Sequence, residues 1–251
     1  MKVSIITATY NSGQTIRDAL VSVGQQTHKD IEHIFVDGYS TDETLSEIYC
    51  HAIENCSVIQ TSPEGIYHAL NKGLENCSGD IVGILHSDDV FASSNVIAEI
   101  ARKFANNPTL DLVYGDLIYV SHLDRTRVVR HWQAGSFDRR SLRNGWMPPH
   151  PTVFVSRRAL PRYVFDASYK ISGDYHALLR LLSDDRLRVG YIPETLVHMS
   201  TGGASNGTIL KTLLRIREDW LVAKSSGFSP LRIIFLKSLR KVFQFSVWRG
   251  K

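Results

Sequence analysis

The amino-acid sequence predicts an α/β fold in which a mostly parallel central sheet is flanked by helices. Short β-rich apolar runs alternate four times with segments of helical apolar spacing in about 105 residues, which is typical of βαβ units. Polar clusters follow three of the expected strands, where parallel sheets bind ligands. The chain has 251 residues, 43% of them hydrophobic, which is enough for one substantial core.

Strands and helices alternate regularly in the first half. Expected strands are 2–8, 31–36, 56–60, 81–86 and 110–120. Helical segments are expected after the turn at 11–13, from 40 toward 51, within 64–77 and at 93–108. Ser40 and Glu43 have the spacing of a capping box, which predicts that the second helix starts there.

The second half is less regular. A proline cluster and then a strand are expected within 144–160, and a helix within 170–185, with Ser172 as its N-cap and Asp174 in its first turn. Residues 187–205 predict two short strands and a glycine-rich loop. Ser229 and Pro230 are typical of a helix start, as N-cap and first residue.

Composition excludes several classes of protein. No run of about 18 uncharged apolar residues predicts a transmembrane helix, and the start of the chain does not resemble a signal peptide. The three cysteines lack metal-type spacing and fit a reducing cytosol. The net charge of +4 comes from the segment after Asp219, which holds seven basic and no acidic residues, so no nucleic-acid partner is expected.

The polar clusters "TATYN", "DGYSTD" and "HSDD" follow the first, second and fourth strands. Asp88 and Asp89 suit a hard divalent cation, or alternatively an acidic cluster favoured by the dipole of the next helix. Asp37 is typical of a turn before Gly38, or alternatively accepts a hydrogen bond from a nucleobase or ribose. Asp174 stands in the first turn of the helix expected within 170–185. The general preference for acidic residues at that position is enough to explain it.

Motifs of other nucleotide-binding and hydrolytic enzymes are missing. The sequence has no G-x-x-x-x-G-K-[ST], no G-x-G-x-x-G after the first strand and no G-x-S-x-G. P-loop, dinucleotide and serine-hydrolase chemistry are therefore not expected.

Five motifs in order resemble family 2 glycosyltransferases: "VSIITATYN", "FVDGYSTDET", "GIYHALNKG", "SGDIVGILHSDDVF" and "ISGDYHALLRL". They cover about residues 1 to 205. Within that family the chain is similar to enzymes of bacterial exopolysaccharide, O-antigen and colanic-acid assembly. The resemblance implies a GT-A fold, which has a Rossmann-like sheet, and inverting transfer of a sugar from a nucleotide-sugar.

The resemblance also implies roles for individual residues. By position, Thr7, Tyr10, Asn11, Asp37, Asn71, Lys72 and Asp88 match donor-binding elements, Asp88 and Asp89 match the metal site for Mn²⁺ or Mg²⁺, and Asp174 matches the catalytic base. Trp146, His150 and His198 are further candidates for acceptor or diphosphate contacts. His86 and His68 depart from the family pattern, since many relatives have an acid at each of these positions.

The C-terminal segment is expected to be an amphipathic helix. Leu231, Ile234, Phe235, Leu239, Val242 and Phe245 share one face, and Lys237, Arg240 and Lys241 gather on the other. Such a helix suits an anionic membrane surface, or alternatively packs on the catalytic domain with its charges solvated. We expect a catalytic domain at 1–206, with its nucleotide-binding half at about 1–120 and its acceptor half at about 121–206, and a basic tail at 207–251.

The expected protein is therefore a metal-dependent glycosyltransferase of cell-surface polysaccharide assembly. Its acceptor is expected to be a lipid-linked saccharide, and its place the cytoplasm, peripheral on the inner face of the cytoplasmic membrane. Two alternatives are a non-catalytic nucleotide-sugar-binding scaffold, favoured by the acid missing at His86, and a sugar nucleotidyltransferase. The second would need a glycine-rich basic loop after the first strand, which "TATYNSGQT" lacks.

Overall fold

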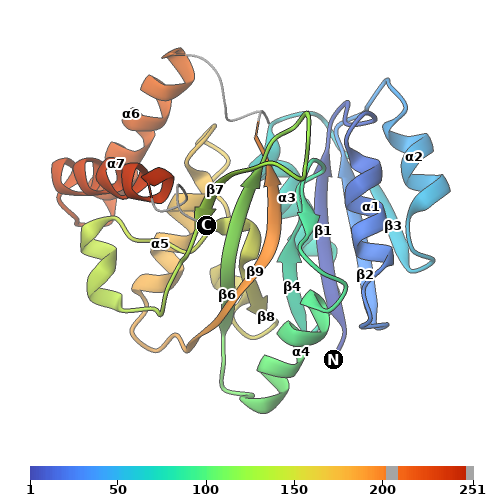
Figure 1. Cartoon of the computed structure of the whole chain (residues 1–251), viewed down its shortest axis with the longest axis horizontal. Coiled ribbons are helices and arrows are strands. Elements are labelled where there is room, and N and C mark those ends of the chain that lie inside the picture. The colour runs from blue at the N-terminus through green and yellow to red at the C-terminus, as the bar shows by residue number, and fades with distance from the viewer. Residues whose placement is uncertain (202–208, 247–251) are drawn as a thin grey trace.

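The structure is a computed structural model that describes residues 1–201 and 209–246, and the side chains of 1–201 and 210–240. In these residues nine strands form one curled sheet with helices on both faces (Figure 1). The strand order is β3-β2-β1-β4-β8-β6-β9-β5, and β7 pairs with β6. This arrangement confirms the predicted α/β class.

The predicted βαβ units form the parallel part of the sheet. They comprise β1 (Val3–Thr9), α1 (Ile16–Gly24), β2 (Ile31–Asp37), α2 (Thr44–His51), β3 (Cys56–Gln60), α3 (Ile66–Asn76) and β4 (Ile81–Ile84). Strands β3, β2, β1 and β4 pair in parallel. In β1, β2 and β4 the side chains on both faces of the sheet are almost all buried, as expected of covered parallel strands, whereas those of the edge strand β3 are exposed or half-buried.

The second half adds antiparallel pairs that the sequence did not predict. It contains β5 (Val90–Phe91), α4 (Val96–Asn106), β6 (Leu112–Val120), β7 (Val128–Trp132), β8 (Phe154–Ser156), α5 (Gly173–Ser183) and β9 (Val189–Ser200), with 3-10 turns at Arg139–Asn144, His150–Thr152 and Leu160–Arg162. Strand β8 pairs antiparallel with β4 and β6. One long strand, β9, replaces the two short strands expected from 187 onward, because irregularities in its pairing with β6 interrupt the register without ending the strand. The glycine-rich loop expected before 205 lies outside the described residues.

The capping-box prediction at Ser40 and Glu43 is wrong. Helix α2 begins at Thr44, and Glu43 at its N-cap makes no side-chain cap hydrogen bond. The Ser40 hydroxyl donates instead to Asp37 at 2.6 Å. The Thr44 amide donates to Asp42 Oδ1 at 3.1 Å. Asp42, the residue before the N-cap, therefore accepts from the first amide of the helix in place of Ser40.

The core lies on both faces of the sheet. One buried cluster packs α3 and α5 against the sheet, and another packs α1 and α4 against its other face. Gly83 of β4 marks the tightest point, since a Cβ there would lie 2.3 Å from the Phe154 ring of β8. The two halves of the sheet are therefore joined by a close contact that only glycine allows.

The C-terminal segment consists of two helices, α6 (Ile209–Ser225) and α7 (Pro230–Ser246), which pack against each other. The start of α7 at Pro230 confirms the predicted helix start. Helix α7 also contacts β7 and the turn Arg139–Asn144 (Figure 1). Neither helix, nor any other in the described residues, combines the length and apolar character needed to cross a membrane.

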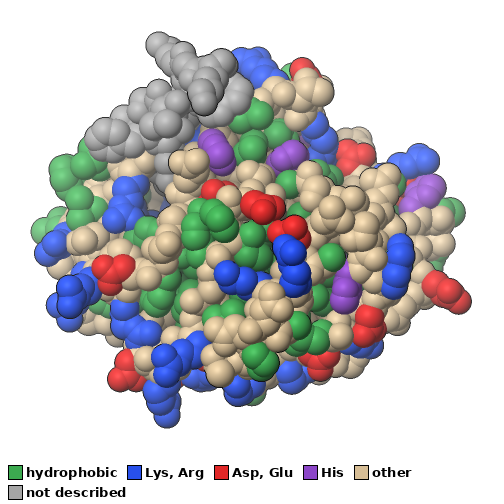
Figure 2. Space-filling model, turned by 60° about the horizontal axis from the view of Figure 1, so that its bottom comes forward, with side chains coloured by type: hydrophobic (Ala, Val, Ile, Leu, Met, Phe, Trp, Pro, Cys, Tyr) green, Lys and Arg blue, Asp and Glu red, His purple; other side chains and the backbone are tan. Residues whose placement is uncertain are grey.

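Charges are mixed on one face of the molecule. On the face drawn in Figure 2, basic and acidic side chains are interspersed, and no single-sign stripe runs across it. This side of the molecule therefore carries no strong one-signed electrostatic field.

Candidate active site

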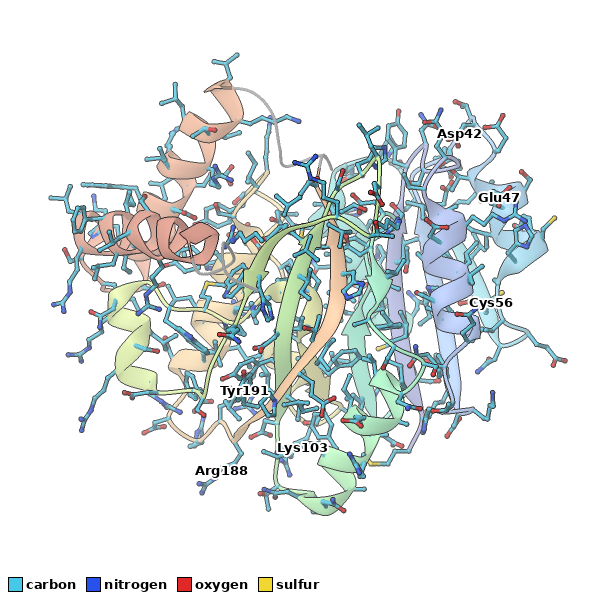
Figure 3. All side chains as sticks on the ribbon, in the orientation of Figure 1. Asp42, Glu47, Cys56, Lys103, Arg188 and Tyr191 are labelled. Carbon is cyan, nitrogen blue, oxygen red and sulfur yellow. The ribbon has the colours of Figure 1, made fainter. Side chains whose placement is uncertain are left out.

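The carboxyl ends of β1, β2 and β4 lie at one end of the sheet, where their loops meet. Figure 3 shows Asp42 at this end and Lys103 and Arg188 at the opposite end. Asp42 Oδ2 accepts a hydrogen bond from the Gly13 amide at 2.9 Å, and its Oδ1 accepts from Thr44. The loops that follow β1 and β2 are thus tied together by one carboxylate.

The first of these loops presents Tyr10 and Asn11. Tyr10 is 60% exposed, so its ring is available to a ligand. Asn11 has φ of 48°, a left-handed conformation that asparagine tolerates. Its Oδ1 accepts from the Thr41 amide at 2.9 Å, while its backbone amide donates to Ser40. The Asn11 side chain therefore fixes the shape of the loop.

Asp37 and Thr7 lie inside the protein at the ends of their strands. Asp37 accepts hydrogen bonds from the hydroxyls of Thr9 at 2.9 Å and Ser40 at 2.6 Å, and from the Ser40 amide. Thr7 donates to the Leu85 carbonyl at 2.8 Å and lies 2.9 Å from His33 Nε2. Both side chains hold the ends of neighbouring strands together inside the protein. Their contacts with a nucleotide-sugar donor stay predictions.

The loop after β4 places Asp88 at the surface of the site and Asp89 in the interior. Asp88 is half-buried, and its carbonyl accepts from Arg125 at 3.1 Å. Asp89 is fully buried, and its Oδ1 accepts from the Ser200 amide at 3.1 Å. Burial, followed by the neighbouring charge of Asp88, raises the pKa of Asp89. Asp89 therefore anchors the end of β9 to this loop.

The donor atoms near Asp88 fit a divalent cation that takes few protein ligands. Within the described side chains, no group of three or more His, Cys, Asp or Glu residues gathers into a metal site. Asp88 is accessible, and the buried Oδ2 of Asp89 has no hydrogen-bond partner among the described residues. Hard cations such as Mg²⁺ accept one or two carboxylates and complete their shell with phosphate oxygens and water.

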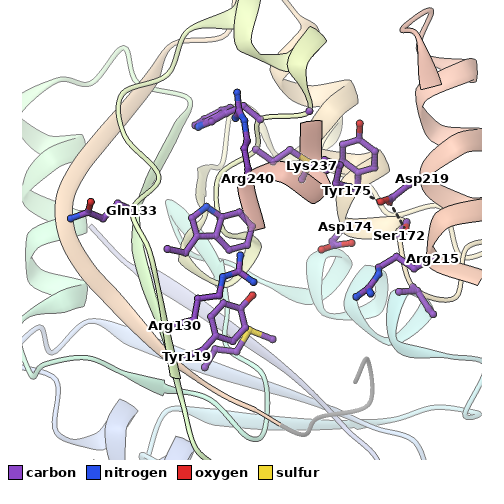
Figure 4. A pocket seen from close by; sticks show the side chains of 16 residues that line it. Tyr119, Arg130, Gln133, Ser172, Asp174, Tyr175, Arg215, Asp219, Lys237 and Arg240 are labelled. Atoms are coloured by element: carbon purple, nitrogen blue, oxygen red, sulfur yellow. Dashed lines mark hydrogen bonds and ion pairs between the residues drawn. The ribbon is translucent and has the colours of Figure 1, made fainter. Parts of the chain in front are cut away.

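A cavity of about 510 Å³ contains the Asp174 carboxylate (Figure 4). Its walls come from β6, β7, α5 and both C-terminal helices. The lining includes Tyr119, Arg130, Trp132, Gln133, Trp146, Met147, Tyr175, Met199, Arg215, Asp219, Lys237 and Arg240. Asp174 lies at the start of α5, where burial is the main cause that raises its pKa. A carboxylate in this state is a better base than an exposed one.

Helix α6 holds the backbone that leads into Asp174. Glu218 is buried, and its carboxylate accepts three amide hydrogen bonds, from Lys170 at 2.9 Å, Ile171 at 2.9 Å and Ser172 at 2.8 Å. Hydrogen bonds to a carboxylate are among the strongest in proteins. The position of Asp174 is therefore fixed by a residue 44 positions further along the chain.

A second set of contacts joins both C-terminal helices to α5. Ser172 is at the N-cap, as predicted, but its hydroxyl donates to Asp219 at 2.9 Å and makes no cap hydrogen bond. Lys237 of α7 donates to Asp219 at 2.7 Å and lies 3.6 Å from the centre of the Tyr175 ring. The alternative in which this helix leaves its charges solvated is wrong for Lys237, because buried Ile233 turns this face inward.

His86 connects the two carboxylates of the site. Burial lowers its pKa, and Asp88 and Asp174 both act on it electrostatically in the opposite direction. The His150 ring lies 5.9 Å from the His86 ring, and burial followed by the charge of His86 lowers the pKa of His150 to about 3. Both rings are therefore neutral at physiological pH unless a ligand changes their surroundings.

The remaining predicted residues fall in different places. Trp146 lines the cavity and donates through Nε1 to the Ala134 carbonyl at 2.8 Å. Asn71 exchanges two hydrogen bonds with the backbone of Phe165, and Lys72 pairs with Glu75, so neither lines the Asp174 cavity. His198 lies on β9, paired with Val90.

Several cavity residues were missed by the sequence analysis. Arg130 and Tyr119 come from paired strands, and Arg215 and Asp219 from α6. The one available signal was the spacing of Ile233, Lys237 and Arg240, which places all three on one helical face. The adjacent acids at 218 and 219, directly before the basic tail, gave no such signal.

Comparisons of the chain with known proteins agree on one family. The model of glycosyl transferase family 2 matches residues 4–167. A PGL/p-HBAD biosynthesis glycosyltransferase of Mycobacterium tuberculosis is 29% identical over 218 residues, covering 84% of this chain and 82% of the relative. The O-antigen biosynthesis protein RfbC of Myxococcus xanthus is 29% identical over 224 residues, covering 82% of this chain and 16% of that protein.

Solved structures share the fold. S. aureus TarS 1-349 in complex with UDP-GlcNAc has a TM-score of 0.66 at 18% identity and covers 94% of this chain and 70% of its own. Mannosyltransferase PcManGT from Pyrobaculum calidifontis, in complex with GDP-Man and Mn²⁺, has a TM-score of 0.65 at 18% identity, with coverage of 94% and 68%. This chain spans 64% of the length of TarS 1-349 without ligand.

Proposed function

The chain belongs to glycosyl transferase family 2, and from this premise we propose that it transfers a sugar, with inversion, from a nucleotide-sugar to a saccharide hydroxyl. The observation that carries the proposal is the cavity that holds the Asp174 carboxylate, which lies close enough to His86 to act on its pKa together with Asp88. The donor complexes of TarS with UDP-GlcNAc and of PcManGT with GDP-Man support the donor class.

Asp174 is the proposed general base. Its raised pKa suits it to take the proton of an acceptor hydroxyl in the cavity. The hydroxyl oxygen then bonds to the anomeric carbon from the side opposite the nucleoside diphosphate. The bond from that carbon to the diphosphate breaks, and its electron pair leaves with the diphosphate. One displacement inverts the anomeric centre without a covalent enzyme intermediate.

Asp88 is the proposed protein ligand of Mn²⁺ or Mg²⁺, with Asp89 behind it. A divalent cation, when bound, stabilises the charge that develops on the departing diphosphate. Asn11 and Asp37 hold the shape of the loops that would receive the nucleotide, and Tyr10 offers an exposed ring beside them. The Mn²⁺ in the PcManGT complex supports a metal at this site.

The test measures binding and transfer separately. Calorimetry with UDP-, GDP- and dTDP-sugars, with and without Mn²⁺, identifies the carrier in the wild-type protein. Asp88→Ala is expected to abolish the effect of Mn²⁺ on binding. Asp174→Asn is expected to keep donor binding and to lose transfer, and NMR of the product shows whether the anomeric centre inverts. If no nucleotide-sugar binds, the proposal fails.

Cell-surface polysaccharide assembly is the proposed setting, with a lipid-linked acceptor. The O-antigen relative supports it. We propose a catalytic domain at 1–206 followed by a basic segment at 207–251, whose helices α6 and α7 complete the cavity and contact the inner face of the cytoplasmic membrane. Helices α6 and α7 expose large apolar side chains, namely Leu210, Leu213, Ile216, Trp220, Leu221, Leu231, Phe235 and Leu239. Apolar side chains near basic ones bind anionic lipid surfaces.

Vesicle co-sedimentation tests the membrane proposal. Leu231 and Phe235 are 71% and 67% exposed, so Leu231→Ser and Phe235→Ser remove apolar surface and leave the cavity intact. Both variants are expected to release the protein from vesicles that contain anionic lipid. Leu123→Ser is the matched control, because Leu123 is 93% exposed on a different part of the chain. Equal binding of all the variants would contradict the proposal.

A further inference from the structure

We infer that the cavity beside Asp174 receives an acceptor with an anionic group, a phosphate or a carboxylate, close to the accepting hydroxyl. The inference rests on the proposed function and names the substrate class of that same site. It comes from the arrangement of charged and aromatic side chains that α6, α7 and the β6–β7 pair bring together around the base.

Cations outnumber acids in the lining of the cavity. Four basic side chains, those of Arg130, Arg215, Lys237 and Arg240, face two acidic ones, those of Asp174 and Asp219. Lys237 is already paired with Asp219 at 2.7 Å. In the described part of the chain, Arg215 and Arg240 have no acidic partner within salt-bridge distance.

Arg215 and Arg240 are held in this cavity at a cost. Both are half-buried, and burial lowers the pKa of Arg240. A cation removed from water is unfavourable unless an anion faces it. The side chains come from two different helices, so a ligand that lies between the helices is contacted from both sides (Figure 4).

Guanidinium groups are suited to this recognition. Their planar forks match the paired oxygens of phosphate and carboxylate. Arg130 shows how such a group is held in place here, since its guanidinium lies 4.8 Å from the centre of the Tyr119 ring and 5.2 Å from that of Trp132. Trp132, Trp146 and Met147 supply an apolar wall on which a sugar ring packs.

The anion belongs to the acceptor and not to the donor. The lining of the cavity contains Asp174 but none of Tyr10, Asp37 and Asp88, which mark the predicted donor site at the strand ends. Since the attacking hydroxyl must approach from the side opposite the leaving diphosphate, a cavity beyond the base receives the acceptor. Its cations then orient the acceptor by an anionic group near the hydroxyl.

The inference is tested by measuring how tightly three small probes bind to the protein. During the titrations the donor site is kept saturated with the nucleoside diphosphate that calorimetry identifies. The probes are glucose 1-phosphate, glucuronate and methyl glucoside, titrated by tryptophan fluorescence, since Trp132 and Trp146 line the cavity. At least one anionic probe is expected to bind about tenfold or more tighter than methyl glucoside. The tighter of the two anionic probes distinguishes a phosphate from a carboxylate.

Matched arginine variants locate the effect. Arg215→Ala and Arg240→Ala are expected to remove the preference for the anionic probe. Arg217→Ala on α6 and Arg232→Ala on α7 are expected to keep it, because both side chains are exposed and outside the cavity. These controls remove the same charge from the same helices, so they separate a specific contact from a change in net charge.

Two results would overturn the inference. In the first, neither anionic probe binds more tightly than methyl glucoside, which includes binding of none of the three. In the second, Arg215→Ala and Arg240→Ala weaken binding of the nucleotide and not of the probe, which would assign these cations to the donor. Failure of the proposed function gives a different result, since then no nucleotide-sugar binds to the wild-type protein.

Discussion

Replacing Glu218 with glutamine is expected to destabilise the protein and loosen the backbone before Asp174. The Glu218 carboxylate accepts amide hydrogen bonds of 2.9, 2.9 and 2.8 Å from three successive residues, 170 to 172. Glutamine has almost the same shape, but its amide nitrogen cannot accept a hydrogen bond. One or two of the three hydrogen bonds are therefore lost. The amide nitrogen of glutamine, which is a donor, then faces a buried backbone N–H, which is also a donor.

The expected loss follows from these bonds. A hydrogen bond to a charged group contributes about 1.5–3 kcal/mol, so Glu218→Gln is expected to lower the free energy of unfolding by about 2–4 kcal/mol. For a chain of this size, 1 kcal/mol corresponds to roughly 2–4 °C in Tm. The expected fall in Tm is therefore on the order of 5–15 °C, measured by thermal unfolding together with urea titration.

A matched control makes the measurement specific. Glu194→Gln makes the same chemical change at an exposed position of β9 and is expected to leave Tm unchanged. A Tm for Glu218→Gln within about 1 °C of the wild-type value would refute the assignment of Glu218 as the support of this backbone. If Tm falls but transfer is unaffected, Glu218 stabilises the fold without positioning the base.

Three further predictions concern packing and protonation. Gly83→Ala is expected to lower the free energy of unfolding in urea by about 1–3 kcal/mol, because its Cβ would lie 2.3 Å from Phe154. Gly24→Ala is the control and is expected to cause no such loss, because its Cβ would lie 3.9 Å from the nearest atom. Burial lowers the pKa of His33 to about 3, below the unfolded value of 6.5, so the unfolded state binds a proton first and stability falls as pH drops from about 6.5 to about 3. His33→Asn is expected to flatten that dependence, and an unchanged slope would contradict it. The raised pKa of Asp174 predicts that kcat/KM declines as pH falls through it, and Asp174→Asn is expected to reduce transfer by about 10²–10⁴-fold, with donor binding as the control readout.

Local patterns predicted the strands and helices of the first half well. The β-branched runs at 2–8 and 31–36 became β1 and β2, because a buried parallel strand needs continuous apolar residues that the chain displays directly. The capping box failed because Ser40 lies three residues after Asp37, and its hydroxyl donates to that carboxylate at 2.6 Å instead of capping α2. Strand β7 was missed because its sequence has only a weak strand pattern. The strand forms because it pairs with β6, a contact that the local sequence does not reveal.

The candidate site was only partly accessible from the sequence. Motif order proposed Asp88 and Asp174 as site residues, and in the structure the charges of both raise the pKa of His86, against the effect of burial. Asn71 and Thr7 matched motif positions, yet the structure uses their side chains in contacts with Phe165 and with Leu85 and His33. A motif position specifies where a residue is in the chain and not which way its side chain turns.

The sequence by itself determined the fold class, the family and the order of the polar motifs after the strands, because each depends on patterns within short stretches of chain. Only the tertiary structure decided how the cavity around Asp174 is built. Lys237 and Arg240 reach the cavity, and Glu218 reaches the backbone before Asp174, because α6 and α7 fold back onto α5 and β7, with Ile233 buried between them. Contacts of that kind leave no local pattern, since their partners are separated by tens of residues along the chain.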